Sequence, residues 1–275
     1  TQAVELWADI LGPGANNAVP AAINVGTMNE VNADAISVAN PTWQGTPWEG
    51  ASGLAGALIG DQSMNPPAQI RIGKMNFSIP DIPSPLPTGN GIDLVGTLYH
   101  EMGHALGISS LALVGEDDDG NPVYGFDTEI SPWDRHLVDR YGVTPTTDME
   151  VVRSEPETAP GADPVFTVGE MTESGVLFKG THVSEVLAGA LNGGLPIEGF
   201  EGDSLDLSHI ELDRSLMSHQ DYRNYQVFME AELAALQDIG YTIDRKNFYG
   251  FSVYGDNLTL SNGQGYFARN AGGTA

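Results

Sequence analysis

Apolar residues recur every three to four positions along several segments, which is the pattern of amphipathic helices. Residues 3–11 follow this pattern and stop at a Gly-Pro-Gly sequence, and residues 225–239 follow it near the other end of the chain. A third segment, residues 92–106, has Asp93 as its N-cap and Gly107 after its last turn. Shorter helices are predicted at residues 53–59, 132–141 and 183–191.

Short runs of β-branched and aromatic residues predict strands in two regions. Three strands are expected in the first third of the chain, and an aromatic, alternating tail begins after Arg245. The early strands are predicted at residues 21–25, 70–72 and 75–79. The stretches between the elements are rich in Gly, Pro, Asn or acidic residues and are predicted as loops, the longest at residues 40–67, 81–91 and 143–164.

This irregular mixture of helices and strands predicts an α+β fold. We expect an N-terminal α/β subdomain over residues 1–107, which ends in the helix at 92–106. An irregular, helix-containing C-terminal subdomain is expected over residues 108–244. Residues 245–275 are predicted to be a tail or the start of a following β-rich region.

Charge and composition narrow the possible functions. The 275-residue chain has 37 acidic and 11 basic side chains, which gives a formal net charge of −26 at pH 7. Such a surface repels the phosphates of nucleic acids and of anionic membranes, so we expect no nucleic-acid partner. No apolar run approaches the roughly 18 residues of a membrane span. Since the chain has no cysteine, any metal must be held by histidines and carboxylates.

The predicted helix at 92–106 contains the sequence HEMGH, which fits the H-E-x-x-H motif. Residues four apart lie on one face of a helix, about 6 Å apart along its axis, so His100 and His104 can bind one Zn²⁺. Glu101 can then take a proton from a metal-activated water as a general base. The apolar neighbours of the motif place it in a core, where two histidines are costly without a partner. A chance match on a solvated helix is therefore the weaker interpretation.

A catalytic zinc needs a third protein ligand. The compact extended motif would place it at position 110, where this chain has Ser110. However, Gly107 occupies the position at which such enzymes turn the chain, and Met217 lies in the sequence SLMS, which looks like a Met-turn. The remaining histidines that could complete the site are His136, His182, His209 and His219.

The downstream sequence resembles the leishmanolysin family of metzincin zinc peptidases. The resemblance is carried by SHIE at 208–211, by SLM at 215–217 and by a helix that ends in LQDIGY at 236–241. Residues 181–187 and 193–199 are also similar to the insertion that separates the ligands in this family. The resemblance extends from about residue 92 to 241.

The resemblance implies a metzincin-type zincin fold with one catalytic Zn²⁺. It implies that His209 is the third ligand beside His100 and His104, and that Met217 forms the Met-turn beneath the metal. It also implies an endopeptidase in which Glu101 is the general base and proteins or peptides are the substrates.

Several alternatives stay open at this stage. Met217 could be an ordinary core methionine, and Tyr222 and Tyr225 could be packing residues or phenol donors to a reaction oxyanion. A glutamate such as Glu116 or Glu129 could replace the third histidine in a gluzincin arrangement. At the level of function, the alternatives are a non-catalytic adhesive or binding module with a structural zinc, and a zinc hydrolase that acts on a non-peptide amide.

Two further expectations concern calcium and location. The acidic sequence DDDGN at 117–121 suits a solvated turn, with a Ca²⁺ site as the less favoured interpretation because its glycine is two positions early for the twelve-residue calcium loop. Since the chain starts at Thr1 without a leader, we expect a processed segment of a longer precursor. An acidic, cysteine-free chain resembles a secreted or surface-attached bacterial member of the family.

Overall fold

A computed structural model describes most of the chain between residues 92 and 243 and shorter segments on either side. The described residues are 2–11, 23–27, 33–37, 68–73, 77–78, 92–128, 130–153, 164–188, 190–212, 215–218, 228–243, 245, 250–254 and 258–262. The helix predicted at 53–59 and the loop predicted at 81–91 lie outside these residues. Among the described residues, the fold is a mixture of helices and several small sheets, which confirms the α+β class.

Four α-helices lie in the described parts of the chain: α1 (Gln2–Leu11), α4 (Leu94–Ala105), α5 (Thr181–Leu187) and α6 (Glu230–Asp238). Single turns of 3₁₀-helix occur at η1 (Asp134–His136), η2 (Met171–Glu173) and η3 (Ala190–Gly193). None of these helices combines the length and the apolar character that a membrane span requires.

The helix predicted at 92–106 is confirmed as α4, with Asp93 as its N-cap. The Oδ1 atom of Asp93 accepts hydrogen bonds from Val95 N at 2.8 Å and Gly96 N at 3.0 Å. The helix predicted at 3–11 is confirmed as α1. The prediction at 132–141 is wrong in extent, because Asp134 binds back to Ser131 and the chain then becomes extended at Leu137. The prediction at 183–191 is shifted, because α5 ends at Ala188 in the left-handed region with φ of 49°.

The first sheet has the order β1-β3-β2. Strand β1 (Ile23–Thr27) runs parallel to β3 (Ala68–Ile72), and β2 (Ala33–Ser37) runs antiparallel to β3. Strand β2 was not predicted, because its sequence ADAIS has a single β-branched residue, Ile36, and no aromatic residue. In the segment predicted at 75–79, the described strand is β4 (Phe77–Ser78), which pairs with β5 (Ile92–Asp93).

The middle of the chain forms a four-stranded sheet with the order β10-β9-β7-β6 and a three-stranded sheet with the order β12-β11-β8. The four-stranded sheet consists of β6 (Leu113–Glu116), β7 (Pro122–Gly125), β9 (Glu150–Arg153) and β10 (Phe166–Val168). The three-stranded sheet consists of β8 (Leu137–Val138), β11 (Leu177–Phe178) and β12 (Leu195–Pro196). Strand β9 lies within the stretch that was predicted entirely as loop.

Two smaller units complete the architecture. Strands β13 (Phe200–Glu201) and β14 (Ser204–Leu205) form a hairpin. Strand β15 (Phe228–Met229) pairs with β16 (Gly250–Tyr254), which pairs in turn with β17 (Leu258–Asn262). The alternating sequence after Arg245 is therefore confirmed as β structure.

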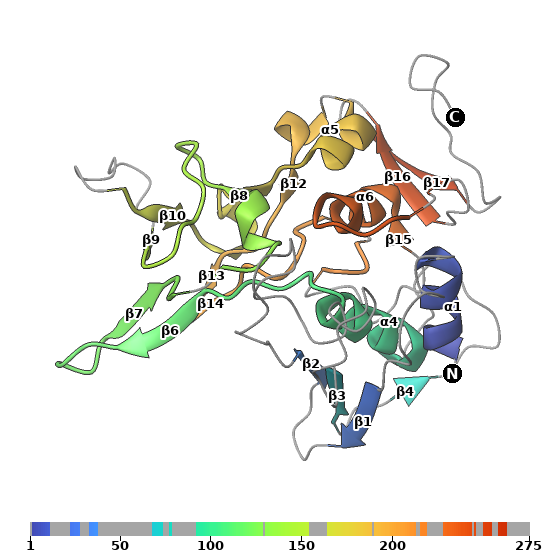
Figure 1. Ribbon diagram of the computed structural model, residues 1–275, viewed down its shortest axis with the longest axis horizontal. Coiled ribbons are helices and arrows are strands. Elements are labelled where there is room, and N and C mark those ends of the chain that lie inside the picture. Colours follow the sequence, from blue (N-terminus) through green and yellow to red (C-terminus); the bar gives the residue numbers. More distant parts are fainter. Residues whose placement is uncertain are drawn as a thin grey trace.

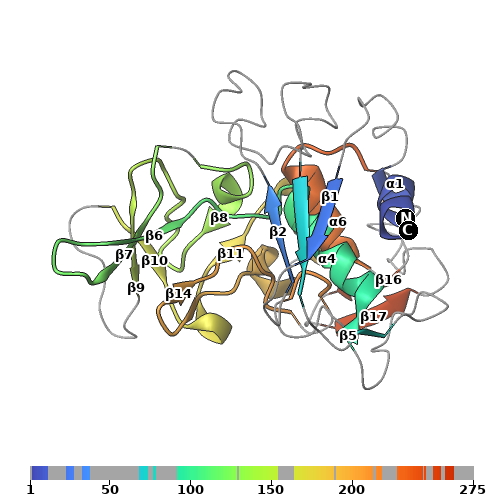
Figure 2. The ribbon, with the colours of Figure 1, turned by 90° about the horizontal axis from the view of Figure 1, so that it is seen from below.

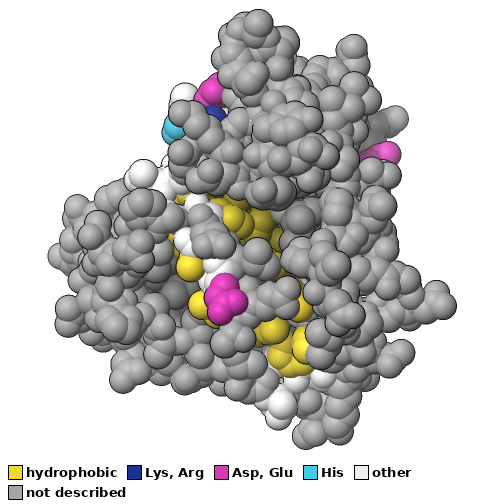
Figure 3. All heavy atoms as spheres, turned by 90° about the vertical axis from the view of Figure 1, so that its right-hand side faces the viewer, with side chains coloured by type: hydrophobic (Ala, Val, Ile, Leu, Met, Phe, Trp, Pro, Cys, Tyr) yellow, Lys and Arg dark blue, Asp and Glu magenta, His cyan; other side chains and the backbone are white. Residues whose placement is uncertain are grey.

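Helix α4 lies between the first sheet and α6 (Figures 1 and 2). It packs against β2 and β3 on one side and against α1 on another. The link to α1 is made by Trp7, whose indole N–H donates to the Tyr99 carbonyl at 3.3 Å and whose ring lies 4.5 Å from that of Phe228. Figure 3 shows the side of the molecule on which α1 lies, where apolar side chains of the described residues surround an acidic group. The contacts of Trp7 and of the first sheet place α4 within the core.

Helix α6 is joined to α5 by one carboxylate at its C-terminal end. Asp238 accepts hydrogen bonds from His182 N and Val183 N, each at 2.9 Å, and so satisfies two amide groups of the first turn of α5. Such groups have no partner within their own helix. The interaction orients α5 on α6 although the two helices are far apart in sequence.

Replacing Asp238 by alanine should remove both acceptors and lower the free energy of unfolding by about 1–2 kcal/mol, the usual cost of a lost helix cap. Chemical denaturation monitored by circular dichroism measures the change. Asp127→Ala, at an exposed aspartate, is the control and should stay within about 0.5 kcal/mol of the parent. Equal stability of both variants would contradict this role of Asp238.

Candidate metal centre

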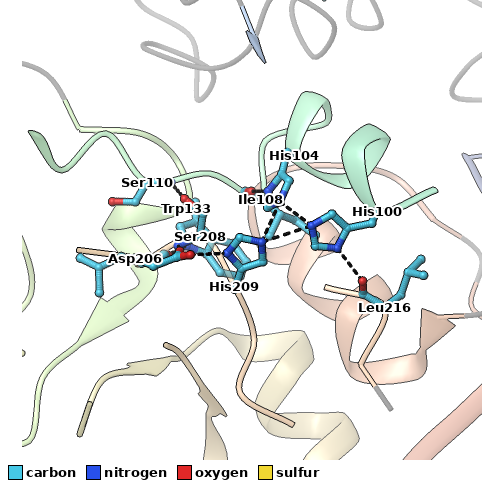
Figure 4. A network of polar contacts seen from close by, with 10 residues as sticks. His100, His104, Ile108, Ser110, Trp133, Asp206, Ser208, His209 and Leu216 are labelled. Atoms are coloured by element: carbon cyan, nitrogen blue, oxygen red, sulfur yellow. Dashed lines mark hydrogen bonds and ion pairs between the residues drawn. The ribbon is translucent and has the colours of Figure 1, made fainter. Parts of the chain in front are cut away.

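Three histidine side chains converge at the junction of α4 with the segment that contains residue 209 (Figure 4). The Nε2 atom of His104 lies 2.9 Å from Nε2 of His100 and 3.2 Å from Nε2 of His209. The third separation, between His209 and His100, is also 3.2 Å. The three histidines are thus arranged as the ligands of a single metal ion. The structure brings together the two histidines of the H-E-x-x-H motif and the histidine that the family resemblance indicated.

Each ring is oriented by a hydrogen bond on its other nitrogen. The Nδ1–H of His100 donates to the Leu216 carbonyl and that of His104 to the Ile108 carbonyl, both at 2.7 Å. The Nδ1–H of His209 donates to Oδ2 of Asp206 at 2.6 Å. Because carbonyl and carboxylate oxygens can only accept, the proton of each neutral ring belongs on Nδ1. All three Nε2 lone pairs therefore point toward one place.

The spacing of these nitrogens fits a tetrahedral metal. Zinc–nitrogen bonds of roughly 2.0–2.1 Å at tetrahedral angles require the nitrogens to be about 3.3 Å apart, close to the separations of 2.9, 3.2 and 3.2 Å. Buried neutral lone pairs that face one another repel in the absence of a cation or proton. The donor set and its geometry thus suit a metal ion with an open fourth position.

Gly107 makes the turn that orients His104. The helix ends there because Gly107 has a φ of 110°, a conformation that residues with a Cβ atom rarely adopt. Its N–H donates to the His104 carbonyl at 3.0 Å, and Ile108 N donates to the Gly103 carbonyl at 3.2 Å. The reversal brings the Ile108 carbonyl back to the ring of His104. Gly107 therefore has a direct structural connection to the metal centre.

The segment that carries His209 is held by main-chain bonds to distant residues. Glu198 N donates to the His209 carbonyl at 3.1 Å, and Ile210 N donates to the Met217 carbonyl at 2.9 Å. On the other side, Ser110 N donates to Oγ of Ser208 at 3.0 Å. The compact motif would have its third histidine at position 110, and here residue 110 instead binds the neighbour of His209.

Met217 lies in the turn at residues 215–218 and packs against Gly103 of α4. It is fully buried, and a Cβ atom built on Gly103 would lie 2.5 Å from its sulfur. Glycine at position 103 therefore permits the methionine to approach the helix that carries two of the ligand histidines. This position agrees with both interpretations of Met217, as a Met-turn residue and as a core residue.

Glu101 is 2% exposed and lies on the same helical turn as His100. Burial lowers the pKa of His209, but the negative charges of Asp206, Glu198 and Glu101 raise it more, so the net shift is upward. Glu101 is thus close enough to the group of histidines to act on it electrostatically.

The other histidines in the described chain have different environments. Both ring nitrogens of His136 contact main-chain carbonyls, those of Lys179 at 2.9 Å and Asp238 at 3.0 Å. The main-chain N–H of His182 binds Asp238 near the start of α5. Neither residue belongs to a group that could hold a metal. Other candidates lie outside the described residues, namely Glu129, His219, Tyr222 and Tyr225.

The acidic sequence at 117–121 forms the turn of the β6–β7 hairpin. Oδ1 of Asp117 accepts hydrogen bonds from Asp119 N at 2.9 Å and Asn121 N at 2.8 Å. The side-chain bond from Asn121, followed by main-chain bonds, lowers the pKa of Asp117. Within the described chain, neither this turn nor Glu116 belongs to a group that could hold a metal.

Asp206 and Glu198 are site residues that sequence reasoning missed. With His209 they form a second group whose ligand atoms lie within 4.8 Å of one another. Burial raises the pKa of Asp206, but the charge and hydrogen bond of His209 lower it more, so the carboxyl stays ionised well below its usual range. The signal in the sequence was the D-x-x-H spacing of residues 206 and 209.

Comparison of the chain with protein-family models, curated proteins and solved structures gives no match. The case for function therefore rests on the geometry of the site and on the motifs.

Replacing Asp206 by asparagine should weaken zinc binding by about 10- to 100-fold at pH 8, the usual effect of losing the partner of a ligand histidine. The loss of zinc affinity relative to the parent should be smaller at pH 6. Asp206 raises the pKa of His209. Its removal therefore also lowers the affinity of His209 for the proton that competes with the metal at low pH.

Chelator competition at both pH values measures these affinities. Asp203→Asn, a change at an exposed residue of the neighbouring hairpin, is the control. An Asp206→Asn variant that binds zinc as tightly as the parent at pH 8 would show that the carboxylate does not support His209.

Proposed function

We propose that this protein is a zinc-dependent endopeptidase of the metzincin type. The observation that carries the proposal is the convergence of the three Nε2 atoms at 2.9, 3.2 and 3.2 Å, with Glu101 on the same helical turn. Secretion or attachment to the cell surface is part of the same proposal and rests on composition and on the resemblance to leishmanolysins.

The donor set favours zinc among the common metal ions. Three neutral imidazoles are typical ligands of catalytic zinc, whereas Ca²⁺ and Mg²⁺ prefer oxygen ligands. A site with three protein ligands keeps a fourth position open, which a closed structural site does not. Zinc bound at His100, His104 and His209 would polarise a water and lower its pKa toward about 7.

Glu101 is the residue that we assign to proton transfer. Its carboxylate would accept a proton as water attacks the substrate carbonyl, and would then return the proton to the leaving amine. Its burial on the helical turn that carries His100 suits this role, because the side chain is held close to the group of histidines. A site that only stabilised the fold would not need such a base.

The strand arrangement beside α4 supports the choice of a peptide as the proposed substrate. Strand β2 is at the edge of the first sheet in the described chain, runs antiparallel to β3 and packs against α4. An extended peptide can add to such an edge through main-chain hydrogen bonds. This mode of binding would bring a peptide bond close to the helix that carries His100 and Glu101.

The change Glu101→Gln should abolish hydrolysis of a protein substrate such as casein, by at least about 100-fold, and leave one zinc bound per chain. The amide cannot accept the proton, while all three histidines stay in place. Activity is measured by release of soluble peptides and zinc by elemental analysis. Turnover close to that of the parent would eliminate Glu101 as the base, and an inactive parent with bound zinc would favour the binding-module alternative.

The change His209→Ala should release zinc at chelator concentrations that the parent resists, and should abolish activity, because two protein ligands hold zinc far less firmly than three. His182→Ala removes a histidine outside the metal group and is the control. If His209→Ala kept stoichiometric zinc in the presence of the chelator, the third ligand would have to be another residue.

A further inference from the structure

The first turn of α6 carries two fully buried carboxylates with different partners. Glu230 and Glu232 are both 0% exposed. Oε1 of Glu230 lies 4.0 Å from Nε of Arg245. Glu232 instead binds the turn at residues 215–218, where its Oε1 accepts hydrogen bonds from Ser215 Oγ at 2.6 Å and Met217 N at 2.9 Å. The two residues therefore form a natural pair for comparison.

Glu232 also binds its own helix. Its Oε2 accepts a hydrogen bond from Met229 N at 2.5 Å, as the third residue of a helix does in a capping box. The carboxylate thus joins the beginning of α6 to the turn at residues 215–218. Ser215 contributes a second link to this turn, because Met217 N also donates to its Oγ at 3.1 Å.

The turn at 215–218 contacts the metal group on two sides. Its Leu216 carbonyl accepts the hydrogen bond that orients the ring of His100. Its Met217 carbonyl accepts a hydrogen bond from Ile210 N, the residue next to His209. A displacement of this turn would therefore change the positions of two of the three ligands.

Burial of a carboxylate at this place is energetically costly. Loss of solvent raises the pKa of Glu232 to about 7, against the opposing effect of its hydrogen bonds from Ser215, Met217 and Met229. Such a group is tolerated in a core when its hydrogen-bond partners are in place. Two of the donors that compensate for the burial of Glu232 belong to the turn at 215–218, which gives the carboxylate a specific role there.

We propose that Glu232 is a positioning residue of the metal centre, which holds the turn at 215–218 in the place where Leu216 orients His100. The proposal rests on the three histidines forming a metal site and is independent of peptidase activity. It predicts that loss of Glu232 weakens metal binding even under conditions in which the variant is fully folded.

The test compares Glu232→Met with Glu230→Met. Both changes remove a buried carboxylate from the same helical turn, and the first removes the acceptor of Ser215 Oγ and Met217 N in the turn at 215–218. Glu232→Met should weaken zinc binding by about 10- to 100-fold, measured by chelator competition, and change the visible absorption spectrum of the cobalt-loaded protein. Glu230→Met should keep the parent's zinc affinity and cobalt spectrum.

The melting temperature of the chelator-treated proteins separates positioning from folding. Glu232→Met leaves three buried donors without their acceptor and should melt lower than the parent, but it should bind zinc weakly even at temperatures well below its melting transition, where it is fully folded. The proposal fails if Glu232→Met binds zinc as tightly as the parent, or if both variants lose affinity equally.

A second variant covers the case in which Glu232→Met does not fold. Ser215→Ala leaves Glu232, its cap on α6 and its direct bond from Met217 N intact, but removes the hydroxyl that donates to the carboxylate and accepts from Met217 N. It should weaken zinc binding by roughly fivefold, as expected for one hydrogen bond. Unchanged affinity and an unchanged cobalt spectrum in this variant would overturn the proposal even if the protein proves to have no peptidase activity.

Discussion

The structure around the site depends on one electrostatic constraint, the convergence of three imidazole lone pairs in a buried place. Each ring is oriented by a hydrogen bond from Nδ1 to a fixed oxygen, and two of these oxygens belong to the main chain. A main-chain carbonyl can be aimed only by the fold of its own segment. The turn after α4 and the turn at 215–218 must therefore keep their conformations for the nitrogens to converge.

This constraint explains several local features that helix propensity alone would not require. Gly107 has a positive φ because the chain must reverse within one turn of His104. Gly103 lacks a side chain because Met217 passes directly beneath it. Glu232 is buried despite the cost, and it anchors the turn that carries the acceptor for His100. Gly103, Gly107 and Glu232 thus all help to position the same ligand histidines, although Glu232 is far from the two glycines in sequence.

The parts of the site that could be predicted from the sequence are those encoded within one helical turn. His100, Glu101 and His104 follow from the geometry of α4, and Asp93 and Gly107 indicate where that helix begins and ends. The position of His209 is different. It depends on main-chain bonds such as that from Glu198 N to the His209 carbonyl, which no local pattern encodes. Only the resemblance to a family indicated this residue before the structure did.

The elements that were predicted wrongly also depend on contacts with distant residues. Apart from Ile36, strand β2 consists of small and polar residues, and it is a strand because β3 provides its hydrogen-bond partners. The segment after Ser131 has helical periodicity, but the carboxylate of Asp134 accepts bonds from Ser131 and from Leu111 N, which confines the helix to one turn. In both cases tertiary contacts override the local preference.

The charges around the histidines connect the fold to the proposed chemistry, because they determine which cation the site favours. Asp206, Glu198 and Glu101 all raise the pKa of His209, so their fields favour a positive charge at this place. A proton and a divalent metal compete for the same Nε2 lone pair, and the metal has the advantage that it satisfies three lone pairs at once. A buried, negatively surrounded group of three neutral donors thus favours a divalent cation over a proton, most strongly above neutral pH, where the proton is scarce.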